Sequence, residues 1–159
     1  MMRVAILTVS DSVSRGQSED GSGPAVRERC KQLGWEVVTT GVVPDEQGVI
    51  QIRLAEMADA GTADIILTTG GTGLGPRDVT PEATLAACQR MIPGIGEQMR
   101  EMGRRENPRA VLSRSTAGVR GQTMIVNLPG SPRGAVESLN AILSLLPHAV
   151  EVLRGARHD

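Results

Sequence analysis

The stretch that decides the fold of this chain is Leu67–Thr84, which reads LTTGGTGLGPRDVTPEAT. Its first residues complete a short apolar run, DIILT at positions 64–68, which is typical of a buried strand. Four glycines follow, and Thr80 and Pro81 then read as the N-cap and the first residue of a helix. A strand, a glycine loop and a helix N-terminus in this order often bind a phosphate group.

Strands and helices alternate on both sides of this stretch. Apolar runs predict strands at 4–9, 35–43 and 123–126, a polar loop at 14–23, and helices at 24–33, 45–60, 81–90, 95–105 and 134–146. The stretch 118–122 reads as one arm of a hairpin, with 123–126 as its partner. We therefore predict an α/β fold, a three-layer sandwich with a mainly parallel sheet and one antiparallel strand, in a single domain covering residues 1–159.

The composition excludes several classes of protein. The 159 residues are 40% hydrophobic and carry a formal net charge of −1, as expected for a soluble globular domain. We expect no nucleic-acid partner, because there is no basic run and Trp35 is the only Phe, Tyr or Trp residue. The N-terminal apolar run is too short for a signal peptide or membrane span, and Cys30 and Cys88 lack CxxC spacing. We expect a cytoplasmic protein with no membrane contact.

Polar side chains follow the first two predicted strands. Ser10, Asp11 and Ser12 come directly after the first strand, and Asp45 follows the second. In open α/β sheets, ligands bind at the carboxyl ends of the strands. The residues 10–12 could equally form a polar turn or a helix N-cap, and Asp45 could equally be the N-cap of the helix that follows it.

Familiar phosphate sites do not match this sequence. A Walker A loop needs GxxxxGK[ST], and the only lysine, Lys31, lies far from the glycines. A Rossmann fingerprint would need a glycine where Pro76 stands. His148 and His158 lie outside every glycine motif, which argues against zinc sites and His-based triads.

The functional groups that remain at the predicted strand ends are carboxylates, hydroxyls, backbone amides and arginines. These groups suit phosphoryl or nucleotidyl transfer to an acceptor that is already anionic, because positioning and Mg²⁺ supply most of the catalysis there. Asp45 and Asp78 are the candidate Mg²⁺ ligands, with Asp11 as a third.

Five segments together identify a family. They are VPDE at 43–46, TTGGTGLGPRDVTPEAT at 68–84, MIPGIGEQMR at 91–100, LSRSTAGVRG at 112–121 and NLPGSP at 127–132. In combination they resemble the molybdenum cofactor biosynthesis proteins of the MogA/MoaB type, a group that includes the gephyrin G domain. The resemblance extends from Val4 to about Leu146.

The resemblance implies a function and an assembly. It implies the molybdopterin-binding α/β fold, a homotrimer or, in the MoaB branch, a hexamer. It implies adenylylation of molybdopterin, in which the terminal phosphate of molybdopterin attacks the α-phosphate of Mg-ATP and pyrophosphate leaves. The alternative is a non-catalytic molybdopterin-binding protein of the MoaB branch. With no fused metal-insertion domain in the sequence, molybdate insertion would need a separate partner protein.

The resemblance also implies site residues, and it favours a site role for Asp45 over the N-cap. Asp45 and Asp78 correspond to the two essential aspartates of the family and would hold Mg²⁺. The substrate-binding positions would be Thr69, Gly70, Gly71, Thr72 and Gly73 in the glycine loop; Asn127, Leu128, Pro129, Gly130 and Ser131 after the last strand; and Ser10, Asp11 and Ser12 after the first. Ser113 and Ser115 are further candidates for phosphate contacts.

Overall fold

The computed structural model of this protein describes residues 1–155 and contains one six-stranded sheet, in the order β2-β1-β3-β6-β5-β4. The strands are β1 (Arg3–Val9), β2 (Glu36–Val43), β3 (Ile65–Thr69), β4 (Arg90–Met91), β5 (Ala117–Arg120) and β6 (Thr123–Leu128). Strands β2, β1, β3 and β6 are parallel, whereas β5 pairs antiparallel with both β6 and β4. The predicted α/β class, the mainly parallel sheet and its one reversed strand are therefore confirmed.

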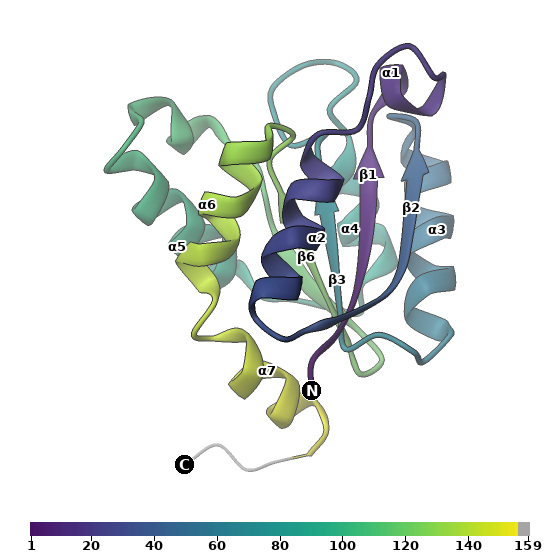
Figure 1. The fold of residues 1–159 in the computed structure, drawn as a ribbon, viewed down its shortest axis with the longest axis vertical. Coiled ribbons are helices and arrows are strands. Elements are labelled where there is room, and N and C mark those ends of the chain that lie inside the picture. Colours follow the sequence, from purple (N-terminus) through teal and green to yellow (C-terminus); the bar gives the residue numbers. More distant parts are fainter. Residues whose placement is uncertain (156–159) are drawn as a thin grey trace.

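Helices cover both faces of the sheet (Figure 1). They are α1 (Asp11–Ser14), α2 (Ser22–Gln32), α3 (Gln47–Asp59), α4 (Thr80–Ala87), α5 (Pro93–Arg104), α6 (Pro132–Ile142) and α7 (Leu146–Leu153), with a 3-10 helix, η1, at Pro108–Leu112. Two separate hydrophobic cores result, one under α2, α5, α6 and α7 and the other under α3 and α4. Along β1, Val4 and Ile6 enter the first core, and Ala5 and Leu7 enter the second. The chain is thus the three-layer sandwich that the sequence predicts.

Several predicted element boundaries are wrong. The segment 134–146 is not one helix, because α6 ends at Ile142 and α7 leaves it at an angle of 64°. The predicted helix 81–90 ends at Ala87, because Arg90 and Met91 pair with β5. The predicted loop 14–23 is shorter than expected, since α1 precedes it and α2 begins at Ser22. His158 lies outside the described residues.

The predicted N-cap at Thr80 is wrong, and the structure also excludes the N-cap alternative for Asp45. Thr80 is the first residue of α4, and its hydroxyl donates to the Gly70 carbonyl at 2.9 Å instead of capping the helix. Asp45 does not cap α3, which begins at Gln47 without a side-chain cap. Both side chains instead form hydrogen bonds with backbone groups of the loops at the carboxyl ends of the strands.

Within residues 1–155, no single helix has the length and hydropathy needed to cross a membrane. In the same residues, only α6 and α7 taken together have the required length and hydropathy, and this pair is bent by 64°. Their buried residues, which include Leu139, Ile142 and Leu146, pack against the sheet in the first core.

Candidate active site

The loops after β1, β3 and β6 meet at one end of the sheet, at the top of Figure 1. Gly70 has a φ of +94°, and a Cβ atom there would lie 2.3 Å from the Val9 carbonyl oxygen. On its other side, the Gly70 amide donates to the Leu128 carbonyl at 3.0 Å. Only glycine combines this backbone conformation with so close an approach. The glycine loop is therefore wedged between the ends of β1 and β6.

Asp11 and Asp45 bind each other's backbone. The Asp11 amide donates to Asp45 Oδ2 at 3.0 Å, and the Asp45 amide donates to Asp11 Oδ1 at 3.0 Å. Arg77 of the glycine loop adds two hydrogen bonds to the Asp11 carboxylate, at 3.1 and 3.0 Å. The ends of β1 and β2 and the glycine loop are thus held together by one network.

The pKa values of Asp11 and Asp45 are shifted in opposite directions. Hydrogen bonds from Arg77 lower the pKa of Asp11 below its ordinary value. Burial raises the pKa of Asp45, and the charges of Asp11 and Asp78 raise it further. A cation beside Asp45 and Asp78 would relieve this repulsion.

The Asp78 carboxylate lies beside Gly73 and Gly75 of the glycine loop. Its Oδ2 atom accepts a hydrogen bond from the Gly75 amide at 2.8 Å, and a Cβ atom on Gly73 would lie 2.9 Å from the same oxygen. Across the loop, a Cβ atom on Gly71 would lie 3.1 Å from Asp45 Oδ1. Glycines 71 and 73 therefore lie against one carboxylate each.

The chemistry of these two carboxylates fits Mg²⁺, which prefers oxygen ligands. Among the described residues, Asp45 Oδ1 and Asp78 Oδ1 accept no hydrogen bond, so each carboxylate keeps one oxygen for a cation. No group of three or more His, Cys, Asp or Glu side chains in residues 1–155 is arranged to hold a metal. Two carboxylates are enough where substrate phosphates complete the Mg²⁺ sphere. Asp11 suits a third ligand less well, because both of its oxygens already accept hydrogen bonds.

The predicted substrate-binding residues fall into two groups. Ser10, Ser12, Gly71, Gly73, Pro129, Gly130 and Ser131 are exposed or partly exposed around the loops. Thr69, Gly70, Thr72, Ser115, Asn127 and Leu128 are buried beneath them. The hydroxyls of Ser10 and Ser131 accept amide hydrogens of Val13 and Gly134, so the N-cap interpretation is confirmed for Ser10.

Asn127 supports the site from below. Its side-chain amide donates to the hydroxyls of Thr68 at 3.1 Å and Thr84 at 2.9 Å, and its side-chain oxygen accepts from the Thr116 amide. Thr69 is likewise occupied, because its hydroxyl accepts a hydrogen bond from Ser22 at 2.9 Å. These side chains are buried, and their hydrogen bonds fix the strand ends.

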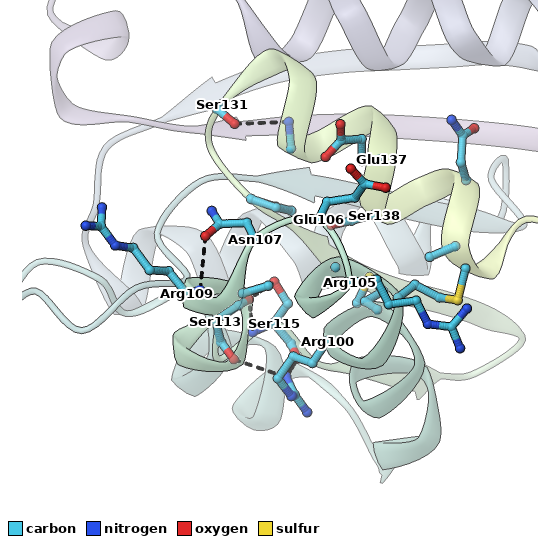
Figure 2. Close-up of a pocket in the computed structure, with 18 residues that line it drawn as sticks. Arg100, Arg105, Glu106, Asn107, Arg109, Ser113, Ser115, Ser131, Glu137 and Ser138 are labelled. Atoms are coloured by element: carbon cyan, nitrogen blue, oxygen red, sulfur yellow. Dashed lines mark hydrogen bonds between the residues drawn. The ribbon is translucent and has the colours of Figure 1, made fainter.

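A groove of about 770 Å³ opens beside the loop that follows β6 (Figure 2). One wall is formed by α5 and η1, and the other by α6. Its polar lining includes Ser113, Ser115 and Ser131, which the sequence selects, and Arg109 and Glu137, which it does not. Met99 and Met102 supply apolar surface. Its size is typical of a site for a small organic ligand.

Sequence reasoning missed three arginines. Arg77 binds Asp11, Arg114 binds the carbonyls of the glycine loop, and Arg100 donates to the carbonyls of Ser113 and Ser115 at 3.2 and 2.8 Å. Each lies inside one of the segments that identify the family. Their location in these segments could have marked them as candidate site residues. Their contacts could not be predicted, because the contacts of an arginine depend on which segments the fold brings together.

Comparison with known proteins identifies the family of this chain. A family described as "Probable molybdopterin binding domain" matches residues 5–148, which include every loop described above. The chain belongs to this family. The predicted resemblance is therefore confirmed.

Relatives within the molybdopterin-binding family are similar over nearly the whole chain. Molybdopterin adenylyltransferase of Helicobacter pylori is 40% identical over 156 residues, which cover 97% of this chain and 89% of the relative. Its namesake in Escherichia coli K12 is 37% identical over 169 residues, covering 97% and 86%.

Solved structures of cofactor biosynthesis proteins are also similar to this chain over nearly its whole length. The molybdopterin biosynthesis enzyme MoaB of Thermus thermophilus has a TM-score of 0.91 and 50% identity, with 100% of both chains covered. The tungsten cofactor synthesizing protein MoaB of Pyrococcus furiosus has a TM-score of 0.86 and 35% identity, covering 96% of this chain and 97% of that one.

Proposed function

We infer that this protein is a molybdopterin adenylyltransferase, which uses ATP to adenylylate molybdopterin in molybdenum cofactor biosynthesis. The observation that carries this inference is the placement of two carboxylates, Asp45 and Asp78, against neighbouring glycines of the loop that follows β3. Relatives named molybdopterin adenylyltransferase support the substrates. Those names do not favour the alternative of a non-catalytic binding protein.

We propose that the glycine loop and the two aspartates receive the triphosphate of ATP. Asp45 and Asp78 would hold Mg²⁺, which neutralises charge on the phosphates and on departing pyrophosphate. Gly71 and Gly73 let the loop backbone lie close against these carboxylates, since a Cβ atom at either position would lie 3.1 or 2.9 Å from a carboxylate oxygen. The loop itself contains no lysine or histidine that could act as a nucleophile.

We propose that molybdopterin occupies the groove between α5 and α6. The groove reaches Ser113 and Ser131, whose hydroxyls can contact a phosphate, with the buried Ser115 bonded to Ser113 behind them, and a polar ring system can pack on its methionines. The groove and the glycine loop share the loop after β6, so the terminal phosphate of molybdopterin can approach the α-phosphate of ATP there. That phosphate is already anionic, and the residues need only orient it.

Pyrophosphate release tests the proposal. Purified protein given molybdopterin, ATP and Mg²⁺ is expected to release pyrophosphate, and Asp78→Asn should lower turnover at least about 100-fold by weakening the metal site. Asp59→Asn is the matched control, because Asp59 binds Arg120 far from the strand ends. Failure of the wild-type protein to release pyrophosphate would sink the proposal. Binding of molybdopterin without any affinity for ATP would support the binding-only alternative.

We further propose a cytoplasmic homotrimer, with a hexamer as the alternative. Free Cys30 and Cys88 suit a reducing compartment. Adenylylated molybdopterin would pass to a separate molybdate-insertion protein. Sedimentation of the purified protein measures the assembly, and a monomer would refute both states.

A further inference from the structure

Arg114 makes an unusual set of contacts with the glycine loop. Its Nε atom donates to the Gly73 carbonyl at 2.8 Å, and its Nη2 atom donates to the Asp78 carbonyl at 2.6 Å. Its Nη1 atom bonds both carboxylate oxygens of Glu82, at 2.5 and 3.1 Å. One guanidinium thus connects the two ends of the segment 73–78 to the first turn of α4.

Besides Arg114, the Arg77 side chain also ties this segment to the rest of the fold, through its two hydrogen bonds to Asp11. Leu74 at its tip is 67% exposed, and residues 75–77 are also exposed. Inside it, the Asp78 amide donates to the Gly75 carbonyl at 3.0 Å, and the Gly75 amide donates to the Asp78 carboxylate at 2.8 Å. The direction of the carboxylate therefore depends on this turn, and the place of the turn depends on Arg114 at its two ends and on the Arg77–Asp11 pair within it.

Arg114 is itself held by a rigid element. Arg100 of α5 donates to the carbonyls of Ser113 and Ser115, the two neighbours of Arg114 in the chain. The Arg114 amide also donates to the Thr72 carbonyl at 2.8 Å. These bonds do not involve the Arg114 side chain, so a substitution there removes the guanidinium and leaves its backbone in place.

We propose that Arg114 is the positioning residue for Asp78, the group that sets the direction of its carboxylate toward the ATP site. The planar fork of a guanidinium can serve two carbonyls and one carboxylate at once, whereas a lysine ammonium is a point charge on a flexible stem. The part of this proposal that concerns catalysis rests on the proposed function. The part that concerns the loop does not.

Arg120 provides a matched control elsewhere in the fold. Its guanidinium also bonds both oxygens of a carboxylate, that of Asp59 at 2.9 and 3.0 Å, and one backbone carbonyl, that of Ala87 at 2.9 Å. Its side chain is 28% exposed, against 37% for Arg114. The two arginines differ mainly in what they hold, since Arg120 contacts no part of the glycine loop.

Amide hydrogen exchange of the unliganded protein, followed by NMR, tests the loop directly. In Arg114→Met, exchange at Gly75 and Asp78 should rise by roughly tenfold for each charge-assisted hydrogen bond lost. Arg120→Met should leave these two amides unchanged. Unchanged exchange in Arg114→Met, or an equal rise in Arg120→Met, would overturn the proposal. If Arg114→Met does not fold, Arg114→Lys takes its place and should show the same rise.

Kinetics of pyrophosphate release test the consequence for catalysis. We expect kcat of Arg114→Met to fall about 10- to 100-fold through misplacement of Asp78, while KM for molybdopterin stays unchanged. Arg114→Lys should not restore kcat, and Arg120→Met should keep it. An unchanged kcat, or a change confined to KM for molybdopterin, would refute the positioning role. If the wild-type protein releases no pyrophosphate, the proposed function fails, and hydrogen exchange alone decides whether Arg114 holds the loop.

Discussion

Replacing Gly71 by alanine tests how closely the glycine loop packs against the site. Gly71 has a φ of +70°, and an alanine Cβ there would lie 2.2 Å from Thr80 Oγ1 and 3.1 Å from Asp45 Oδ1. The Thr80 hydroxyl donates to the Gly70 carbonyl in a fully buried position, so it cannot turn away without leaving that carbonyl unpaired. The substitution therefore forces one buried hydrogen bond to break.

The expected loss of stability has two parts. The left-handed backbone conformation costs a residue with a Cβ about 1–2 kcal/mol. The unpaired carbonyl adds about 1–3 kcal/mol, which brings the total to about 2–5 kcal/mol. Gly61→Ala isolates the first part, because Gly61 has a φ of +71° and open space around its Cβ position. It should cost only about 1–2 kcal/mol.

Urea unfolding followed by far-UV circular dichroism measures both variants. In a Thr80→Ala background, where the clashing hydroxyl is absent, the cost of Gly71→Ala should fall close to that of Gly61→Ala. Gly71→Ala should also lower turnover, since it displaces Asp45, whereas Gly61→Ala should not. Equal costs for the two single variants, or an excess that persists without the Thr80 hydroxyl, would refute this account of the loop.

Three further substitutions probe the network around the site and the far end of β3. Although burial alone would raise the pKa of Asp64, hydrogen bonds from Arg3 and Arg154 hold it below the ordinary 3.8. Asp64→Asn should therefore cost about 1–3 kcal/mol at neutral pH, and urea midpoints should converge with the wild type as pH falls through the folded-state pKa; a constant difference would contradict this. Asn127→Leu should cost about 2–4 kcal/mol in urea, because it leaves the buried hydroxyls of Thr68 and Thr84 without their donor; a neutral result would mean that the hydroxyls find other partners. Arg77→Gln should change stability by less than about 1 kcal/mol, since the Arg77 side chain is 55% exposed and water screens the ion pair, yet lower kcat by freeing Asp11; a large loss of stability with normal kcat would exclude this role.

Local pattern was enough to predict much of the fold. The apolar residues of α3, Ile50, Leu54, Met57 and Ala58, recur at helical spacing, and all four are buried. The continuous apolar runs of β1 and β3 predict strands that are covered on both faces, as they are. Boundaries were less predictable where tertiary contacts decide them, as at Arg90 and Met91, which leave helical conformation to pair with β5.

The candidate site divides in the same way. The glycines, Asp45 and Asp78 stand out in the sequence because phosphate chemistry at strand ends uses these residue types. What the sequence could not show is which polar side chains face a ligand. Asn127 and Thr69 carry suitable groups, but both are fully buried and bonded to other side chains.

The sequence alone therefore determined most of the elements, the α/β class and the residue types of the site, since these follow from periodicity and from the chemistry of each side chain. Only the tertiary structure decided that Asp11 and Asp45 hold each other's backbone, that Arg77 joins them, and that Arg114 holds Asp78. These contacts join residues that are 34 to 66 positions apart in the chain. No local pattern encodes such pairs, because packing of the strands and helices into layers is what brings them together.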